Sequence, residues 1–157
     1  MSAKLQTITR RATLADLPAV LELQKLAFLS EAELLGDYNI SPLKQTLPEK
    51  EAEWRKGLIL VTQSPNGERI VGSVQAIEEK GRVLVGKLIV DPKWQNQGLA
   101  TDLLKALEKI FGPTTYELHT SSKSLKNLHL YHKIGYQEVK RAPMTDSVDF
   151  VYLEKTI

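Results

Sequence analysis

A glycine stands at the point where an apolar segment ends and a helical pattern begins, within residues 94–104, WQNQGLATDLL. A helix N-terminus exposes unpaired backbone N–H groups and carries a partial positive charge, so it binds phosphate where the backbone can be approached closely. Gly98 removes the side chain that would block this approach, and Ala100 is nearly as small. The turn could therefore hold a pyrophosphate, although a glycine at such a turn is also a common conformational requirement.

This stretch differs from the best-known nucleotide motifs. A P-loop requires Gly-Lys-Ser/Thr, and the dinucleotide-binding fingerprint needs three glycines directly after a strand. Neither pattern surrounds Gly98, so binding of a simple nucleotide is the weaker interpretation.

A second set of chemically useful residues lies further along the chain. Ser124, Asn127, Leu128 and Tyr131 are three, four or seven residues apart, so on a helix they share one face. This spacing aligns a hydroxyl, an amide and a phenol. The alternative is that Tyr131 is a core residue whose hydroxyl finds a partner at the rim, which is the more common fate of a helical tyrosine.

The composition is that of a folded domain. The chain has 157 residues, of which 42% are hydrophobic and 25% charged, close to the average for soluble globular domains. We therefore expect one domain over residues 1–157. The absence of cysteine excludes disulfides, thiolate metal ligands and a cysteine nucleophile. Because no His/Asp/Glu set has ligand spacing either, we expect no metal.

Charge and hydropathy indicate no special partner. The net charge is +2 without a block of like charges, which is weak evidence for a nucleic-acid surface and suits a small anionic ligand equally well. No segment approaches the roughly 20 apolar residues of a membrane span, and the first residues lack the apolar centre of a signal peptide. We expect a cytoplasmic protein that binds neither nucleic acid nor membrane.

The elements that would position these residues begin with a strand and a helix. TITRRAT has the composition of an edge strand. Thr13 and Asp16 then form a capping-box pattern, followed by apolar residues at helical spacing, which predicts a helix over 14–29. The region 30–56 is interrupted by glycine and proline, so it predicts short helical pieces joined by turns.

From residue 57 the period becomes that of strands. Three Val- and Ile-rich segments separated by turn residues predict three consecutive antiparallel strands: LILVTQS, ERIVGSVQAIEE and GRVLVGKLIVDP. The next apolar residues repeat at three and four and predict a helix that Gly112-Pro113 ends. A strand over TYELHT, a helix over SLKNLHLYHKI and a closing pair of strands follow. The order predicts a single mixed α/β (α+β) domain.

The segment Gln95-Asn96-Gln97-Gly98-Leu99-Ala100 resembles the Arg/Gln-x-x-Gly-x-Gly/Ala signature of the GNAT superfamily of acyl-coenzyme-A-dependent N-acetyltransferases. LIVDP is similar to the strand before that signature, RRATLADLPAVLEL to the opening strand and helix, and LYHKIGYQEV to the Leu-Tyr-x-Lys-x-Gly-Phe/Tyr segment. The resemblance leaves region 30–56 uncovered. It implies the GNAT fold, a mixed and mostly antiparallel sheet of about six to seven strands flanked by about four helices.

The resemblance also implies acetyl-coenzyme A as the cosubstrate. In the family, backbone amides of the signature loop hold the pyrophosphate, and the pantetheine arm pairs like an extra strand with the strand before it. The candidate cofactor-binding residues are Leu88, Ile89, Val90, Gln95, Asn96, Gln97, Gly98, Leu99, Ala100, Thr101, Ser124, Asn127 and Tyr131. Two departures from the pattern are Gln95, which replaces the commoner arginine and removes a positive charge, and Asn96, which stands where a second glycine is frequent.

Acetyl transfer from a thioester to an amine needs a neutral amine, a polarised carbonyl and a proton for the departing thiolate. The resemblance makes Tyr131 the general acid. With ordinary pKa values of about 10 for tyrosine and about 8.5 for a thiol, the proton transfer would have little driving force in either direction.

The general base is harder to find, because many relatives carry a glutamate on the strand where this chain has only Lys87. His119, with an ordinary pKa near 6.5, is the catalytic candidate, although a histidine without a catalytic task is more common. A water chain ending on a carboxylate would also serve. The acidic candidates are Glu31, Glu33, Asp37, Glu78 and Glu79.

The region 30–48 is expected to form part of the acceptor pocket, as it does in the family. Glu31 and Tyr38 are the candidate substrate-binding residues, although a solvated acidic face would explain the cluster equally well. The resulting prediction is an N-acetyltransferase that transfers acetyl directly to a primary amine in a ternary complex. The alternatives are a non-catalytic acyl-coenzyme-A sensor or regulatory module and a protein or peptide acetyltransferase. A homodimer would be common for this fold.

Overall fold

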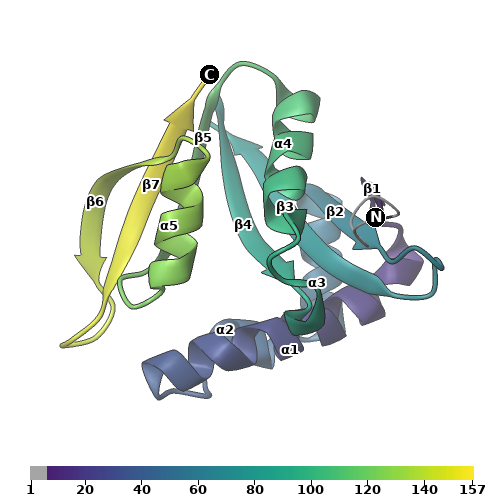
Figure 1. Ribbon diagram of the computed structural model, residues 1–157, viewed down its shortest axis with the longest axis horizontal. Coiled ribbons are helices and arrows are strands. Elements are labelled where there is room, and N and C mark those ends of the chain that lie inside the picture. The colour runs from purple at the N-terminus through teal and green to yellow at the C-terminus, as the bar shows by residue number, and fades with distance from the viewer. Residues whose placement is uncertain (1–6) are drawn as a thin grey trace.

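A seven-stranded mixed sheet runs through the computed structural model, which describes residues 7–157, and helices cover both of its faces (Figure 1). The strands are β1 (Ile8–Arg11), β2 (Leu58–Gln63), β3 (Ile70–Glu79), β4 (Arg82–Val90), β5 (Thr115–Ser121), β6 (Gln137–Pro143) and β7 (Asp149–Thr156). Their order in the sheet is β1-β2-β3-β4-β5-β7-β6. Only the β4–β5 pair is parallel among these strands, which confirms the predicted mixed, mostly antiparallel sheet.

The helices are α1 (Leu17–Leu35), α2 (Ser41–Lys44), α3 (Leu47–Lys56), α4 (Leu99–Phe111) and α5 (Leu125–Lys133), with 3-10 turns η2 (Leu14–Asp16) and η3 (Pro92–Trp94). The first helix is longer than the predicted range 14–29. Its start matches the expected capping box, in which the Thr13 N–H donates to the Asp16 carboxylate at 2.7 Å. The helix then continues through Leu35, because helix-forming residues follow Ser30 and the chain first reverses at Gly36, where φ is 67°.

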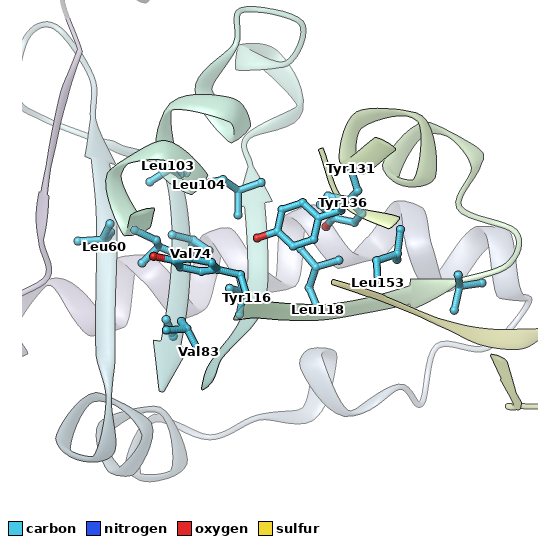
Figure 2. Close-up of a cluster of buried hydrophobic side chains, with 14 residues drawn as sticks. Leu60, Val74, Val83, Leu103, Leu104, Tyr116, Leu118, Tyr131, Tyr136 and Leu153 are labelled. Atoms are coloured by element: carbon cyan, nitrogen blue, oxygen red, sulfur yellow. The ribbon is translucent and has the colours of Figure 1, made fainter. Parts of the chain in front are cut away.

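The two faces of the sheet carry separate sets of helices. On one face, α4 and α5 pack against the main core, which contains leucines of α4 together with Tyr116, Tyr131 and Tyr136 (Figure 2). On the other face, a smaller core joins α1 and α3 to β2. The Trp54 indole N–H donates to the Ala12 carbonyl at 2.9 Å and ties α3 to the residue that follows β1. The sheet is therefore held from both sides.

The parallel pair β4 and β5 separates part of the way along its length. Pairing is confined to Arg82, Val83 and Leu84 with Thr115, Tyr116 and Glu117. Beyond these residues the two strands diverge toward α1, which lies across the wide end of the opening (Figure 1). Since the facing backbone edges lack each other as partners there, this wedge can accept an extended ligand as an additional strand.

A β-bulge bends β4 inside this wedge. Ile89 pairs with Ser73 and Gly86 with Gln75, so two residues of β4, Lys87 and Leu88, oppose the single residue between Ser73 and Gln75. Lys87 has a φ of 48°, a left-handed conformation that is uncommon for a residue with a side chain. The bulge turns the strand and redirects the Lys87 side chain.

Candidate active site

The signature loop connects β4 to α4 and is fixed by a buried aspartate. Asp91 is 2% exposed, and its carboxylate accepts hydrogen bonds from the Lys93 backbone N–H at 2.9 Å and from Arg69 at 3.1 Å. The Trp94 N–H donates to the Asp91 carbonyl at 2.7 Å. These bonds hold the start of the loop, so the residues that follow reach α4 along a defined path.

Two residues of the loop adopt left-handed backbone conformations. Gly98 is the N-cap of α4 with a φ of 80°, and Asn96 has a φ of 62°. Glycine enters this region freely, and asparagine is among the residues that tolerate it best. Asn96 can therefore adopt the left-handed conformation that a glycine would take at this position.

The N-terminus of α4 is open to a ligand. Gly98 has no side chain that could cap the helix. The first backbone N–H groups of α4, at Leu99, Ala100 and Thr101, therefore have no N-cap side chain as a partner. Leu99 is buried and anchors the helix to the core. In the same loop, the buried Gln97 Oε1 has no hydrogen-bond partner among the described residues. The free N–H groups at the start of α4 are donors that an anionic ligand could use, whereas the Gln97 oxygen is an acceptor.

The strand residues proposed to contact the pantetheine arm border the wedge. Ile89 is buried and pairs with Ser73, and Val90 pairs with Gly72. Leu88 packs against the main core. All three lie on β4 beyond its last pairing with β5, so an edge of β4 is available at the predicted place.

Helix α5 places Tyr131 in the core beside this wedge. Its side chain is 6% exposed, and its ring lies 6.0 Å from that of Tyr136. Burial, together with the negative charge of Glu31, raises the pKa of Tyr131 well above its ordinary value. The ordinary value used for the sequence prediction therefore does not apply, and the phenol stays protonated throughout the neutral range. Such a group can still donate a hydrogen bond to a thiolate, whereas complete transfer of its proton to the thiolate is uphill.

Ser124 and Asn127 occupy the start of the same helix. Ser124 is the N-cap of α5 and is 5% exposed. Its hydroxyl contacts both carboxylate oxygens of Glu31 at 2.8 Å and lies 2.9 Å from the Ser121 hydroxyl. The Asn127 amide donates to the Thr120 hydroxyl at 3.3 Å. The structure thus brings Glu31, predicted as a substrate-binding residue, to the end of the helix that carries Tyr131.

His119 lies on the opposite face of the sheet from Tyr131. Its neighbour Leu118 packs into the core with Tyr131, and alternate residues of a strand face opposite sides. The His119 ring packs edge-on against Phe150, with centroids 5.6 Å apart, and against Tyr152. Partial desolvation lowers its pKa below the ordinary 6.5. The imidazole is therefore neutral at pH 7 and able to accept a proton.

A cavity of about 820 Å³ lies on this second face, with His119, Leu84, Gly86, Gln75, Lys140 and Tyr152 among its lining residues. It spans the point where β4 and β5 begin to separate. A side chain at Gly86 would meet no atom within 4 Å, so the strand leaves open space there. The cavity and the buried Tyr131 side chain are therefore on opposite faces of the sheet.

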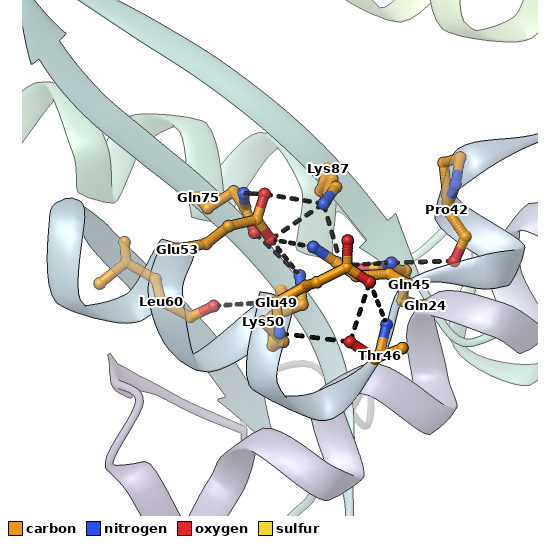
Figure 3. Close-up of polar contacts among 11 residues, drawn as sticks. Gln24, Pro42, Gln45, Thr46, Glu49, Lys50, Glu53, Leu60, Gln75 and Lys87 are labelled. Carbon is orange, nitrogen blue, oxygen red and sulfur yellow. Dashed lines mark hydrogen bonds and ion pairs between the residues drawn. The ribbon is translucent and has the colours of Figure 1, made fainter.

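Lys87 stands on β4 where the resemblance led us to look for a glutamate, and the structure pairs it with a carboxylate from another element. Its ammonium donates to both carboxylate oxygens of Glu53, on α3, at 2.9 and 2.8 Å, and to the Gln45 side-chain carbonyl at 3.0 Å (Figure 3). Lys50, only 1% exposed, contacts Glu53 at 3.2 Å and the Gln75 side chain at 3.0 Å. Two ammonium groups thus share one carboxylate beside the wedge.

The charges of this cluster determine which group could move a proton. Burial by itself would raise the pKa of Glu53, but hydrogen bonds from Lys87 and Gln45 and the two ammonium charges outweigh it and hold the pKa at about 2. Burial and the charge of Lys87 lower the pKa of Lys50 to about 8. Glu53 is therefore a structural counter-ion and a poor base. Sequence reasoning missed it, although a lysine within the apolar run VLVGKLIV signals that a carboxylate must reach it.

The remaining acidic candidates and Tyr38 lie at the surface. Tyr38 is 59% exposed in the turn after α1, and Glu33, Asp37, Glu78 and Glu79 are also exposed. Of the predicted acidic residues, Glu31 is the one that the structure brings to the end of α5. Over residues 7–157 no group of three or more His, Asp or Glu side chains is arranged to hold a metal ion. None of the helices in that range is long and apolar enough to cross a membrane.

The chain belongs to the GNAT acetyltransferase family, because a family model described as acetyltransferase (GNAT) domain matches residues 55–138. No curated protein sequence matches the chain. Among solved structures, it is similar to a PaiA N-acetyltransferase from Thermoplasma acidophilum in complex with coenzyme A, with a TM-score of 0.77 and 19% identity over 100% of both chains.

Two further solved structures differ from each other in the acceptor that they name. A ribosomal-protein-S18-alanine N-acetyltransferase from Escherichia coli has a TM-score of 0.77 and 18% identity, covering 96% of this chain and 94% of its own. A spermidine N-acetyltransferase chimera that includes Vibrio cholerae sequence has a TM-score of 0.74 and 20% identity, covering 96% and 95%. These likenesses establish the fold and leave the acceptor to be argued from this chain's own residues.

Proposed function

We propose that this protein is an acetyl-coenzyme-A-dependent N-acetyltransferase that acetylates a primary amine by direct transfer in a ternary complex. The observation that carries the proposal is the wedge between β4 and β5, which has the uncapped N-terminus of α4 beside one strand and the buried Tyr131 beside the other. Acetyl-coenzyme A, when bound, supplies the acetyl group as a reactive thioester.

Different residues along the wedge bind different parts of acetyl-coenzyme A. Backbone N–H groups at the start of α4 bind the pyrophosphate, since a glycine N-cap leaves them accessible. The free edge of β4 around Leu88 and Val90 binds the pantetheine arm by strand-like hydrogen bonds. Ser124 and Asn127, at the start of α5, orient the arm or the amine. Each of these contacts positions the thioester in the wedge.

Tyr131 then stabilises the leaving group. Its phenol stays protonated at neutral pH because burial and Glu31 raise its pKa, so it can donate to sulfur as negative charge develops there. A hydrogen bond that forms only in the transition state increases turnover without tightening cofactor binding. Because its pKa is raised, Tyr131 keeps its proton and donates only a hydrogen bond. The coenzyme A thiolate then takes a proton from solvent after the carbon–sulfur bond has broken.

The amine approaches from the cavity on the opposite face. Neutral His119 lines that cavity and can remove the proton that the amine loses, directly or through water. The Glu31 side chain lies at the wide end of the wedge beside Ser124, where an acidic group would attract a cationic amine before transfer. Placing donor and acceptor on two sides of the wedge permits direct attack without a covalent enzyme intermediate.

The test compares Tyr131→Phe with Tyr136→Phe. Both residues are buried tyrosines in the same core, with rings 6.0 Å apart, so each variant removes one hydroxyl from a similar environment. Thiol release with acetyl-coenzyme A should be measured against a panel of polyamines, amino acids, aminoglycosides and peptides. We expect turnover of Tyr131→Phe to fall about a hundredfold with the Kd for coenzyme A nearly unchanged, and Tyr136→Phe to retain activity.

The possible results separate the alternatives. Binding of acetyl-coenzyme A without turnover on any amine would favour a sensor, and turnover on peptides alone would favour a protein acetyltransferase. A fully active Tyr131→Phe would remove this phenol from the mechanism.

A further inference from the structure

Lys126 reaches the signature loop from a different element. It is the second residue of α5, and its ammonium donates to the Gln95 side-chain carbonyl at 2.9 Å. The two residues are 31 positions apart in sequence, and both are exposed. The contact therefore brings a positive charge to the loop that leads into Gly98, next to the open N-terminus of α4.

Gln95 is the position at which the family signature commonly has arginine. Glutamine binds by hydrogen bonds but carries no charge, so the loop by itself offers a diphosphate only backbone amides and neutral side chains. A lysine ammonium has three donors, and the bond to Gln95 uses one of them. The remaining donors are available to an anion at the loop.

We propose that Lys126 supplies the cation that binds the pyrophosphate of coenzyme A, in place of the arginine that Gln95 replaces. This inference rests on the proposed use of coenzyme A and adds a binding residue from α5 to it. Gln95 holds the lysine over the loop, and the lysine acts as a point charge toward phosphate oxygens. A glutamine–lysine pair from two elements thereby does what one arginine does in the signature.

The pyrophosphate is favoured over the 3′-phosphate by the position of the contact. Gln95 lies three residues before the N-cap of α4, and the exposed N–H groups of that helix select the place where a diphosphate binds. Because Gln95 holds Lys126 near this place, Lys126 contacts the diphosphate. Removing the 3′-phosphate should therefore leave the contribution of Lys126 to binding unchanged.

The experiment measures the Kd of the full chain for coenzyme A and for 3′-dephospho-coenzyme A by calorimetry at about 0.15 M salt, where the Debye length is about 8 Å. Lys126→Ala should weaken binding of both ligands about tenfold, the loss expected for one hydrogen bond between charged groups. The matched control is Lys133→Ala, which removes the same charge from the last residue of α5, roughly 10 Å along the helix axis. Its Kd should change less than about twofold, because salt screens a charge at that distance.

A rescue variant tests whether an arginine at position 95 can replace Lys126. Gln95→Arg in the Lys126→Ala background should recover the Kd to within about threefold of the wild type, because the guanidinium restores the missing charge at the loop. Raising the salt concentration to about 1 M should reduce the difference between wild type and Lys126→Ala.

Three results would overturn the inference. An unchanged Kd for Lys126→Ala, in a wild-type protein that binds coenzyme A, would remove Lys126 from the site and leave the proposed function standing. If Lys126→Ala weakens binding of coenzyme A but not of the 3′-dephospho form, Lys126 contacts the 3′-phosphate and not the pyrophosphate. Failure of the wild type to bind either ligand would instead overturn the use of coenzyme A, and with it this inference.

Discussion

Replacing Glu53 with glutamine should destabilise the protein by removing the carboxylate that Lys87 and Lys50 share. The pKa of Glu53 is about 2, against an ordinary 4.5, a difference of 4.5 − 2, or about 2.5. At about 1.36 kcal/mol per pKa unit this corresponds to about 3.4 kcal/mol. The Glu53 side chain is 31% exposed, so solvent screening reduces the value, and we expect Glu53→Gln to lower the free energy of unfolding by about 2 kcal/mol at pH 7.

The sign of the pH dependence follows from the lowered pKa. A carboxylate whose pKa is lower in the folded state contributes stability that is fully present above its unfolded value, 4.5, and is lost as the pH falls through its folded value, about 2. Glutamine does not titrate. The difference between wild type and Glu53→Gln should therefore be largest at pH 7 and shrink to less than about half by pH 3.

Urea unfolding of both proteins at pH 7 and pH 3 measures these differences. Glu51→Gln is the matched control, because it removes the same charge from α3 at a surface ion pair, where Arg55 lies 3.6 Å away. Its effect should stay within about 0.5 kcal/mol. A Glu53→Gln protein as stable as this control at pH 7, or a difference independent of pH, would refute the idea that Glu53 is the buried counter-ion of the two lysines.

Two further predictions concern the site directly. Gly98→Val should weaken coenzyme A binding at least about tenfold while circular dichroism shows a folded protein, because valine opposes the left-handed N-cap conformation and covers the α4 amides. The control is Gly81→Val, which introduces similar backbone strain at a hairpin glycine with a φ of 76°. Equal effects of both variants on binding would contradict a phosphate site at the start of α4. If His119 is the base, kcat/KM should fall on the acid side with an apparent pKa below 6.5, since protonation removes its lone pair; His119→Gln should abolish that limb, and an unchanged profile would exclude His119 as the base.

Much of the fold could be predicted from the sequence because its signals are local. The Val- and Ile-rich alternation of β2, β3 and β4 and the regular apolar spacing of α4 each depend on residues within one element. The end of α1 was predicted too early, since Gly36 marks a helix end only once the residues from Ser30 to Leu35 are recognised as helix formers. The alternation along TYELHT could also have placed His119 on the face away from Tyr131.

The sequence by itself determined the path of the loop that we propose binds phosphate, because a glycine between a strand and a helix, with asparagine at the other left-handed position, is a requirement of the local backbone. Only the tertiary structure decided the contacts between residues far apart in the chain. These include Lys87 with Glu53, Ser124 with Glu31, and Lys126 with Gln95. Such pairs depend on how α1, α3 and α5 pack on the sheet, and the pattern of one segment carries no information about the charge that another segment brings to it.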